Sequence, residues 1–432
     1  MKNIIVTKYG GSSITSTNNL DLIKKITLDD NRRKVIVLSA PGKINNKDEK
    51  VTDLLIQLGK TKDESIIQII NHKYKIIYQE DVSDKIQERF NLSLNNDAYL
   101  DSLKSLGEEL NAKLLSKKLN FEYVDPKELF LVSENFGNAK ILDVSENMIK
   151  NRLKENKIYV IPGFFGYTKN KNIATFSRGG SDLTGAYIAS SLESLLYENF
   201  TDQEGILAAN PEIVDNPKKI DEITFKEMRD LSYSGFNIFH QEALAPLAKK
   251  KIPIHVRKTI NYPIKGTFIV DDRISDINKP IIGIAYKNNF CMFNIYKMGL
   301  DDENGIEEKI LRIFSKNKLS IMSPPAEIDD ISVILDQNQL KDNVVNTLKK
   351  EIYETLHNDG EVNFEDNLGV LVLSGKGLNG NIKILADIQT TLYENNIELK
   401  FINAGLLKRC IIYGINSYDG KKAVNLIYER YL

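Results

Sequence analysis

Short apolar runs that end in glycine or polar turns alternate with longer amphipathic stretches through the first 260 residues. Residues 4–6 lead into a glycine turn at 9–13, residues 18–25 have helical spacing, and residues 35–38 form a second apolar run. Strand, glycine turn, helix and strand in this order predict a βαβ unit and a parallel sheet. Polar-rich helices are expected over 63–118. Further expected elements are strands at 159–161, 174–176, 195–200 and 252–256 and a helix at 242–250.

The last third of the chain repeats one pattern twice, after a Pro-, Gly- and Asp-rich stretch at 261–279 that is typical of a linker. Each repeat reads as strand, helix, two strands and helix, which is a split βαβ arrangement. The first repeat is expected to contain strands 290–296, 319–322 and 331–335 and helices 306–316 and 340–357. The second is expected to contain strands 370–373, 399–402 and 410–415 and helices 381–395 and 420–430. This pattern predicts a duplicated small module.

The second repeat contains a G-x-G-x-x-G sequence at residues 375–380, between a predicted strand and a predicted helix. In that context the motif is a dinucleotide-binding candidate. Too few residues follow Gly380 to complete a dinucleotide-binding domain, and they read as strand, strand and helix. We therefore expect the glycines to let this turn approach a neighbouring subunit or a small effector.

Length and composition narrow the class of protein. A chain of 432 residues is long enough for at least two cores, and its net charge of −1 argues against broad nucleic-acid binding. The only cysteines, Cys291 and Cys410, exclude a disulfide framework and favour a reducing cytoplasm. No apolar run approaches the ~20 residues that span a bilayer. The four histidines show no metal-ligand spacing with the cysteines.

The first candidate site lies at residues 8–13, where a lysine precedes a glycine turn at the end of a predicted strand. Backbone N–H groups of Gly10 and Gly11 are able to approach an anion closely, and Lys8 would bring a point charge to a transferring phosphoryl group. The chain has no Walker A sequence. An ordinary turn would show the same local pattern.

A more informative segment, residues 178–182, crowds an arginine, two glycines, a serine and an aspartate at the start of a helix expected through 192. Capping of the helix N-terminus by Ser181 or Asp182 would explain these two residues but not the preceding Arg178. Because arginine binds carboxylates with two hydrogen bonds, the segment suggests a small acidic substrate, with Asp182 orienting Lys8. Residues 201–206 also follow a strand, and alone they would read as a polar hairpin turn.

Taken in order, these segments resemble the aspartokinases of the amino acid kinase superfamily, and the match covers nearly the whole chain. The matching segments are K-Y-G-G-S-S at 8–13, V-T-D-L-L at 51–55, G-E with Leu110 and Ala112 at 107–112, N-F-G-N-A at 135–139, G-F-F-G at 163–166, R-G-G-S-D at 178–182, T-D-x-x-G-I at 201–206 and I-D-E-I at 220–223. The resemblance implies an α/β fold, with helices sandwiching a mostly parallel sheet, followed by two ferredoxin-like βαββαβ ACT domains. The implied boundaries are 1–275 for the catalytic domain and 285–360 and 366–432 for the ACT-like domains, whose strands are allowed to interleave.

The resemblance also implies a reaction, namely ATP-dependent phosphorylation of the β-carboxylate of L-aspartate to 4-phospho-L-aspartate, the first step towards lysine, threonine and methionine. Mg²⁺ would accompany ATP. Lys8 and Asp182 take the implied catalytic roles, and no residue is assigned to a metal. The implied ATP-binding residues are Lys8, Gly10, Gly11, Ser12, Ser39, Thr201, Asp202, Gly205, Ile206, Leu207, Glu212 and Asn237. The implied aspartate-binding residues are Thr52, Glu108, Arg178, Gly179, Gly180 and Ser181, with Glu108 on the ammonium and Arg178 on a carboxylate.

Three positions depart from the family pattern near the nucleotide. Where many members have G-I-Y-T-x-D-P-R, Leu207 replaces the tyrosine and Glu212 the arginine, and Asn237 replaces the lysine of G-A-K-V-L-H. Two cations expected beside ATP are therefore missing, with Arg257, Lys258 or Lys218 as candidate substitutes.

The ACT-like tail implies feedback by an amino-acid effector, lysine and/or threonine, and a homodimer or higher oligomer. The candidate effector-lining residues are Met298, Gly305, Ile306, Ser320, Ile321 and Met322, although core packing explains Ile306, Ile321 and Met322 equally well. Two other functions compete. A sister kinase acting on glutamate or N-acetylglutamate would not need duplicated ACT-like domains. An amino-acid-sensing regulatory paralogue with weak or no kinase activity would explain the missing cations but not the retained Lys8, Glu108, Arg178 and Asp182.

Overall fold

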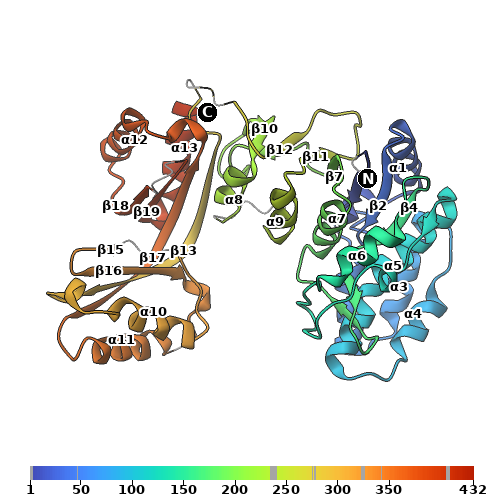
Figure 1. The fold of residues 1–432 in the computed structure, drawn as a ribbon, viewed down its shortest axis with the longest axis horizontal. Helices are drawn as coiled ribbons and strands as arrows, with labels where there is room; N and C mark the ends of the chain where they lie inside the picture. The colour runs from blue at the N-terminus through green and yellow to red at the C-terminus, as the bar shows by residue number, and fades with distance from the viewer. Residues whose placement is uncertain are drawn as a thin grey trace. The chain divides into compact units, whose positions relative to one another are not determined.

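The computed structural model describes residues 3–45, 47–233, 241–274, 276, 279–322, 326–341, 343–404 and 409–432. It divides into two compact units, each treated by itself below (Figure 1). The described residues of the first unit fall within 3–206, 219–229 and 241–273. Those of the second fall within 207–218, 230–233 and 274–432. No helix within the described ranges combines the length and apolar character that a membrane span requires.

The first unit is built on an eight-stranded sheet in the order β10-β12-β11-β7-β1-β2-β4-β3. Its strands are β1 (Ile5–Tyr9), β2 (Arg33–Leu38), β3 (Glu122–Tyr123), β4 (Tyr159–Pro162), β7 (Leu196–Thr201), β10 (Glu222–Thr224), β11 (Ile254–Lys258) and β12 (Thr267–Val270). Every neighbouring pair is parallel except β11 and β12. The central strand β1 is buried along its whole length, as expected for a parallel sheet covered on both faces. The predicted mostly parallel α/β sheet is confirmed.

Helices surround this sheet. They are α1 (Thr17–Asp29), α2 (Val51–Thr61), α3 (Ser65–Tyr78), α4 (Ser83–Phe90), α5 (Asn96–Leu119), α6 (Val144–Arg152), α7 (Gly180–Ser191), α8 (Phe225–Tyr233) and α9 (Gln241–Lys250). A hairpin of β5 (Phe165–Tyr167) and β6 (Ile173–Thr175) completes the unit, and β8 (Ile206–Leu207) with β9 (Lys219–Ile220) forms a separate two-stranded pair. Helices α1, α2, α3 and α5 share one large core with β1 and β2, whereas α7 packs against β1 and α9.

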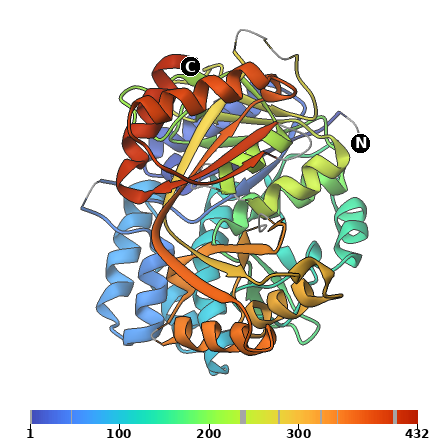
Figure 2. The same ribbon diagram turned by 90° about the vertical axis from the view of Figure 1, so that its left-hand side faces the viewer.

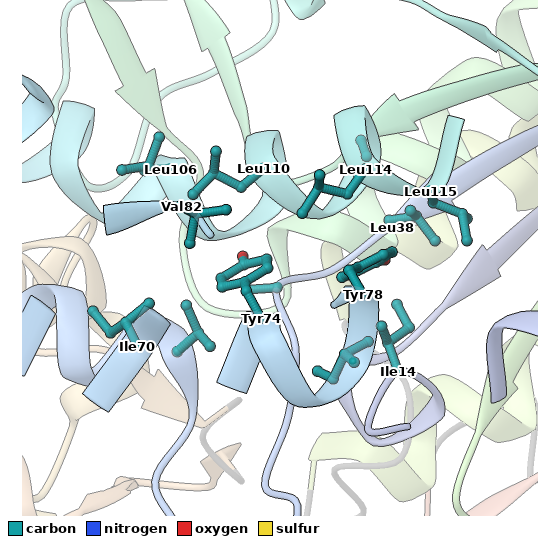
Figure 3. Packing of buried hydrophobic residues seen from close by; sticks show 14 of the residues in the cluster. Ile14, Leu38, Ile70, Tyr74, Tyr78, Val82, Leu106, Leu110, Leu114 and Leu115 are labelled. Atoms are coloured by element: carbon teal, nitrogen blue, oxygen red, sulfur yellow. The ribbon is translucent and has the colours of Figure 1, made fainter. Parts of the chain in front are cut away.

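The long helix α5 is held in place by α3. Tyr74 and Tyr78 of α3 lie beneath the leucines of α5 (Figure 3), and the Tyr74 hydroxyl donates to the carbonyl oxygen of Gly107 over 2.8 Å. A buried tyrosine needs such a partner for its hydroxyl. The bond fixes the rotation of α5 at the residue that precedes Glu108.

In the second unit, both predicted small modules contribute to one antiparallel sheet, in the order β14-β16-β13-β17-β19-β18 with β15 paired to β16. Its strands are β13 (Gly283–Tyr296), β14 (Ile321–Met322), β15 (Ala326–Glu327), β16 (Asp330–Asp336), β17 (Glu361–Ser374), β18 (Leu399–Ala404) and β19 (Cys410–Asn416). The 14-residue strands β13 and β17 run through both halves of the sheet (Figure 2). Two separate cores lie on it, one under α10 (Ile306–Lys316) and α11 (Val344–Thr355), the other under α12 (Ile382–Glu394) and α13 (Gly420–Tyr431).

Two expectations need correction. The stretch 261–279 is not simply a linker, because it contains β12, which pairs with both β10 and β11. The glycine turn at 375–380 approaches its own chain. A Cβ atom on Gly375 would lie 2.2 Å from the carbonyl oxygen of Pro280, and one on Gly377 would lie 2.3 Å from the Cα of Pro280. This close approach accounts for Gly375 and Gly377 without a ligand, and Gly380 adopts φ +71°.

Residues 207–218 are built into the second unit by hydrogen bonds to two of its elements, β13 and α13. The amide of Ile284 in β13 donates to the carbonyl oxygen of Ala208 over 2.8 Å. The side chain of Asn425 in α13 donates to Ile213, and the amide of Lys218 donates to the hydroxyl of Tyr428 over 2.7 Å. This segment therefore folds with the tail rather than with the strands that precede it.

Candidate functional site

The centre of the candidate site is an ion pair between Lys8 and Asp182. The Lys8 Nζ atom lies 2.7 Å from Asp182 Oδ1, and the two side chains are only 10% and 15% exposed. Asn199, paired in register with Lys8 on the neighbouring strand β7, donates from Nδ2 to the same carboxylate oxygen over 3.2 Å. The structure thus brings the two predicted catalytic residues together, with the Lys8 ammonium next to Gly10, whose Cβ position lies 3.6 Å away.

The glycine turn after β1 is joined to the turn after β2. A Cβ atom on Gly11 would lie 2.7 Å from the carbonyl oxygen of Ala40, and the amide of Gly42 donates to Gly11 over 2.9 Å. Ser12 lies in the same 3₁₀ turn, Gly11–Ser13, and is partly exposed. Only glycine permits this approach, so the turns after the two strands lie directly against each other. Ser39 stands at that second strand end, its amide bonded to Tyr9 over 3.1 Å.

The neighbouring Glu108 presents a buried carboxylate. Its side chain accepts a hydrogen bond from the backbone N–H of Ala40, and its Oε2 atom has no partner among the described residues. Burial raises the pKa of Glu108 to about 8, a cost that the Ala40 hydrogen bond offsets only in part. A buried carboxylate that lacks a cation is suited to receive one from a ligand.

Arg178 is an exposed cation, in contrast to the buried Glu108. Its side chain has no ion-pair or hydrogen-bond partner within the described parts of the chain. The loop that carries it is anchored on its C-terminal side. Gly179 adopts φ +84° to cap α7, and Gly180 packs so closely that a Cβ there would lie 2.8 Å from the Cβ of Phe176. Ser181 is buried against Gly163. The loop therefore presents a free guanidinium from a fixed base.

Thr52 occupies the second position of α2 and is partly exposed. Val51, the first residue of α2, packs closely against Gly107 and so positions the helix. A Cβ on Gly107 would lie 3.2 Å from Val51 and 2.7 Å from the Cβ of Ala40. The start of α2, the end of β2 and the Glu108 turn of α5 therefore meet at one point.

The residues assigned to the nucleoside follow β7. Thr201 donates to the Asp202 carboxylate over 2.9 Å, and its carbonyl oxygen accepts from the amide of Thr259 over 3.0 Å. The hydroxyls of Thr259 and Ser13 lie 2.6 Å apart, which ties this strand end to the glycine turn. The remaining assigned residues are Gly205 and Ile206 (both buried), Leu207 (partly buried) and Glu212 (exposed). Asn237 lies outside the described residues.

The three candidate substitute cations differ in availability. Arg257 is committed to Glu198, at 3.1 Å, and to the carbonyl oxygen of Ile264. The Nζ atom of Lys218 is bonded to the carbonyl oxygen of Leu432. Lys258 makes only a loose ion pair, 3.7 Å from Glu204, and lies in register with Thr201. Among the three, Lys258 is the side chain left for a ligand.

Residues that the sequence reasoning did not single out include Asn199 and Asp101, whose side chains are buried. A signal for Asp101 is present in the sequence. Asp101, Lys104, Glu108 and Asn111 recur at intervals of three and four along a helix that otherwise buries mainly apolar residues. Within the part of the chain that the structure describes, no three His, Cys, Asp or Glu side chains come close enough to hold a metal ion.

Comparisons with known proteins decide the family. Residues 3–258 match the model of the amino acid kinase family. Aspartokinase 3 of Bacillus subtilis is 36% identical over 99% of this chain and 98% of its own length. The chain belongs to the aspartokinases. Among solved structures, the aspartate kinase of Clostridium acetobutylicum, described as an allosteric enzyme, is similar to it with a TM-score of 0.86 at 34% identity, covering 99% of this chain and all of its own.

A more distant aspartokinase shares the same fold. Aspartokinase III of Escherichia coli, solved in complex with aspartate and ADP, matches 99% of each chain with a TM-score of 0.79 at 20% identity. The resemblance inferred from the ordered segments between residues 8 and 223 is confirmed by these matches, and so is the expected combination of a mostly parallel sheet with antiparallel-sheet domains.

Proposed function

We propose that this aspartokinase transfers the γ-phosphoryl group of ATP to the β-carboxylate of L-aspartate, giving 4-phospho-L-aspartate and ADP. The observation that carries the proposal is a pair of groups without partners among the described residues, the buried carboxyl group of Glu108 and the exposed guanidinium of Arg178, in the unit that holds the Lys8–Asp182 pair. An amino dicarboxylate offers an ammonium to Glu108 and a carboxylate to Arg178. Thr52, Gly179, Gly180 and Ser181 complete the proposed aspartate site.

In the transfer, an oxygen of the aspartate β-carboxylate forms a bond to the γ-phosphorus as the bond to the β-γ bridging oxygen breaks. Lys8, oriented by Asp182, whose carboxylate also accepts from Asn199, stabilises the charge on the transferring group, and the glycine turn at Gly10, Gly11 and Ser12 holds the phosphates. Ser39 lies at the adjacent strand end. Thr201, Asp202, Gly205, Ile206, Leu207 and Glu212 form the proposed nucleoside side, together with Asn237. Mg²⁺, carried in with ATP, neutralises phosphate charge.

Trapping the acyl phosphate with hydroxylamine tests the proposal directly. The purified chain with ATP and Mg²⁺ should form a hydroxamate with aspartate but not with glutamate or N-acetylglutamate. Hydroxamate from either of those acids instead of aspartate would indicate the sister activity. No hydroxamate under any effector condition would leave the amino-acid sensor as the function.

Replacing Lys258 by methionine should raise the KM for ATP about fivefold, the effect of losing one solvent-exposed charge contact of about 1 kcal/mol. The KM for aspartate should stay unchanged, since Lys258 stands beside Thr201 on the nucleoside side. Lys251→Met is the matched control, because Lys251 is an exposed lysine that precedes the same strand and pairs with Asp271. An unaltered ATP KM in Lys258→Met would remove Lys258 from the nucleotide site.

We also propose residues 1–275 as the catalytic domain and 285–360 and 366–432 as two regulatory domains that bind lysine and/or threonine at a homodimer or higher-order interface, in a cytoplasmic enzyme. Met298, Gly305 and Ser320 are exposed, and Gly305 begins α10 with open space around its Cβ position. Ile306 and Met322 are buried, Ile306 within the core under α10, and Ile321 is partly buried, so the first two would act through packing.

Feedback should appear as a fall in hydroxamate formation when lysine and threonine are titrated singly and together. The amino acid that inhibits at the lower concentration identifies the effector. Activity that is insensitive to both would contradict the regulatory assignment while leaving the kinase assignment intact.

A further inference from the structure

Asp101 is a buried carboxylate on α5 that binds two backbone segments of the candidate site. Its Oδ2 atom accepts hydrogen bonds from the amide of Thr175, over 2.6 Å, and from the amide of Gly137, over 2.8 Å. Its Oδ1 atom pairs with Lys104 at 2.7 Å, and the side chain is 3% exposed. A carboxylate shared by two N–H groups and a cation is a strong, directional anchor.

The two segments that Asp101 binds are themselves joined, because the amide of Ala139 donates to the carbonyl oxygen of Thr175 over 3.0 Å. Thr175 is the last residue of β6 and lies three residues before Arg178. Asp101 thus anchors the arginine loop on its N-terminal side, whereas Gly179 and Gly180 anchor it on the other side.

On the same helix, Glu108 lies seven residues after Asp101. Seven residues are two turns of an α-helix, so both carboxylates lie on one face, about 10 Å apart along the axis. Glu108 is held at its end by the amide of Ala40 and by the Tyr74–Gly107 bond. One rigid helix therefore carries the proposed ammonium-binding group and the anchor of the proposed carboxylate-binding loop.

We propose that Asp101 is a positioning residue that sets the separation between Glu108 and Arg178, and thereby selects an amino dicarboxylate of the length of aspartate. The proposal rests on the proposed function, since it assigns the two ends of the substrate to these residues. Without the anchor, the amides of Thr175 and Gly137 each lose a buried hydrogen bond, and the distance of the arginine loop from Glu108 is no longer fixed.

The kinetics of Asp101→Ala and Asp101→Asn test this assignment. In Asp101→Ala, the KM for aspartate should rise at least tenfold, with the KM for ATP within twofold of wild type. The preference for aspartate over glutamate, compared as kcat/KM, should fall. Asp101→Asn keeps an oxygen acceptor for the two amides, so we expect a rise of about threefold and partial rescue.

Glu109→Gln is the matched control. Glu109 lies on the same helix and is mostly buried, but it pairs with Arg89 and Lys113 rather than with the site loops. It should leave both KM values unchanged. Equal increases in the two KM values of Asp101→Ala, or no increase for aspartate, would overturn the assignment. If Asp101→Ala does not fold, Asp101→Asn decides, and an aspartate KM within error of wild type overturns it. Failure of the proposed function would instead show as a wild-type chain that forms no hydroxamate from aspartate.

Discussion

Replacing Lys8 by methionine should lower kcat for hydroxamate formation by about 10²- to 10³-fold, the scale for losing one preorganised electrostatic group. Lys8 is the cation at the end of the central strand β1, and its ammonium stands beside the glycine turn proposed to hold the phosphates. Because its charge acts on the transferring group, the loss should fall mainly on kcat. Both KM values should change by less than tenfold.

Asp182→Asn should lower kcat less than Lys8→Met does. The lysine charge would remain, but its ion-pair partner would no longer hold it in place, so kcat should fall by about tenfold, less than in Lys8→Met. Lys297→Met, assayed without effector, is the matched control, because Lys297 is a buried lysine paired with Glu303 in the second unit. A Lys8→Met enzyme with near-normal kcat would refute the catalytic role of Lys8.

Glu108→Gln should raise the KM for aspartate by about 10²-fold, since a charge-assisted contact to the ammonium in a buried setting is worth several kcal/mol. The KM for ATP should change little, because the glutamate is assigned to the amino group alone. In hydroxamate assays at saturating ATP, the variant should approach wild-type rates only at very high aspartate. An unchanged aspartate KM would remove Glu108 from the site.

The same substitution should stabilise the ligand-free protein, and increasingly so as pH rises. Glu108 in the folded protein has a pKa near 8, above its ordinary value, so the folded state binds the extra proton between about pH 4.5 and 8. The wild type therefore loses up to about 1.4 kcal/mol of stability per pH unit across this range, and glutamine does not. Unfolding of the first unit, followed by urea, should show the advantage of Glu108→Gln growing by about 2 kcal/mol from pH 6 to pH 8.

The adjacent Glu109 supplies the contrast. Its partners Arg89 and Lys113 lower the pKa of Glu109 despite the burial, so its stabilising contribution is lost only as pH falls through the acidic range. Glu109→Gln should therefore lower stability by an amount that stays constant between pH 6 and pH 8. If the two neighbouring variants showed the same pH trend, the assignment of the raised pKa to Glu108 would fail.

The candidate ligand-binding residues at the strand ends were predictable from the sequence because neighbouring residues in the chain define them. A lysine before two glycines at residue 8 and an arginine before two glycines at residue 178 mark sharp turns whose side chains must face a ligand or solvent. Asn199 and Asp101 were not predictable in this way, since the partner of Asn199 is 17 residues away in sequence and the backbone amides that Asp101 binds are 36 and 74 residues away. Strand β12 was missed because it lies within a Pro- and Gly-rich stretch, where composition favours a linker.

In the tail, the order of helices and strands followed from periodicity, but the lengths of β13 and β17 did not. The extension of β13 pairs with the predicted part of β17, as Ile284 does with Leu373, and the extension of β17 pairs with the predicted part of β13, as Glu361 does with Tyr296. No local pattern encodes that pairing. Similarly, the glycines at 375 and 377 signalled a close approach, but only the folded chain identifies Pro280 as the neighbour.

The attachment of residues 207–218 to β13 and α13 determines where chimeras between related enzymes should be joined. A chimera cut at residue 274 would pair this segment with a foreign tail and replace the Ile284, Asn425 and Tyr428 partners of its backbone. The part of the chain that must be exchanged as one module is therefore discontinuous in sequence. A regulatory tail transplanted from a relative should fold cleanly only when it travels with its own copy of residues 207–218.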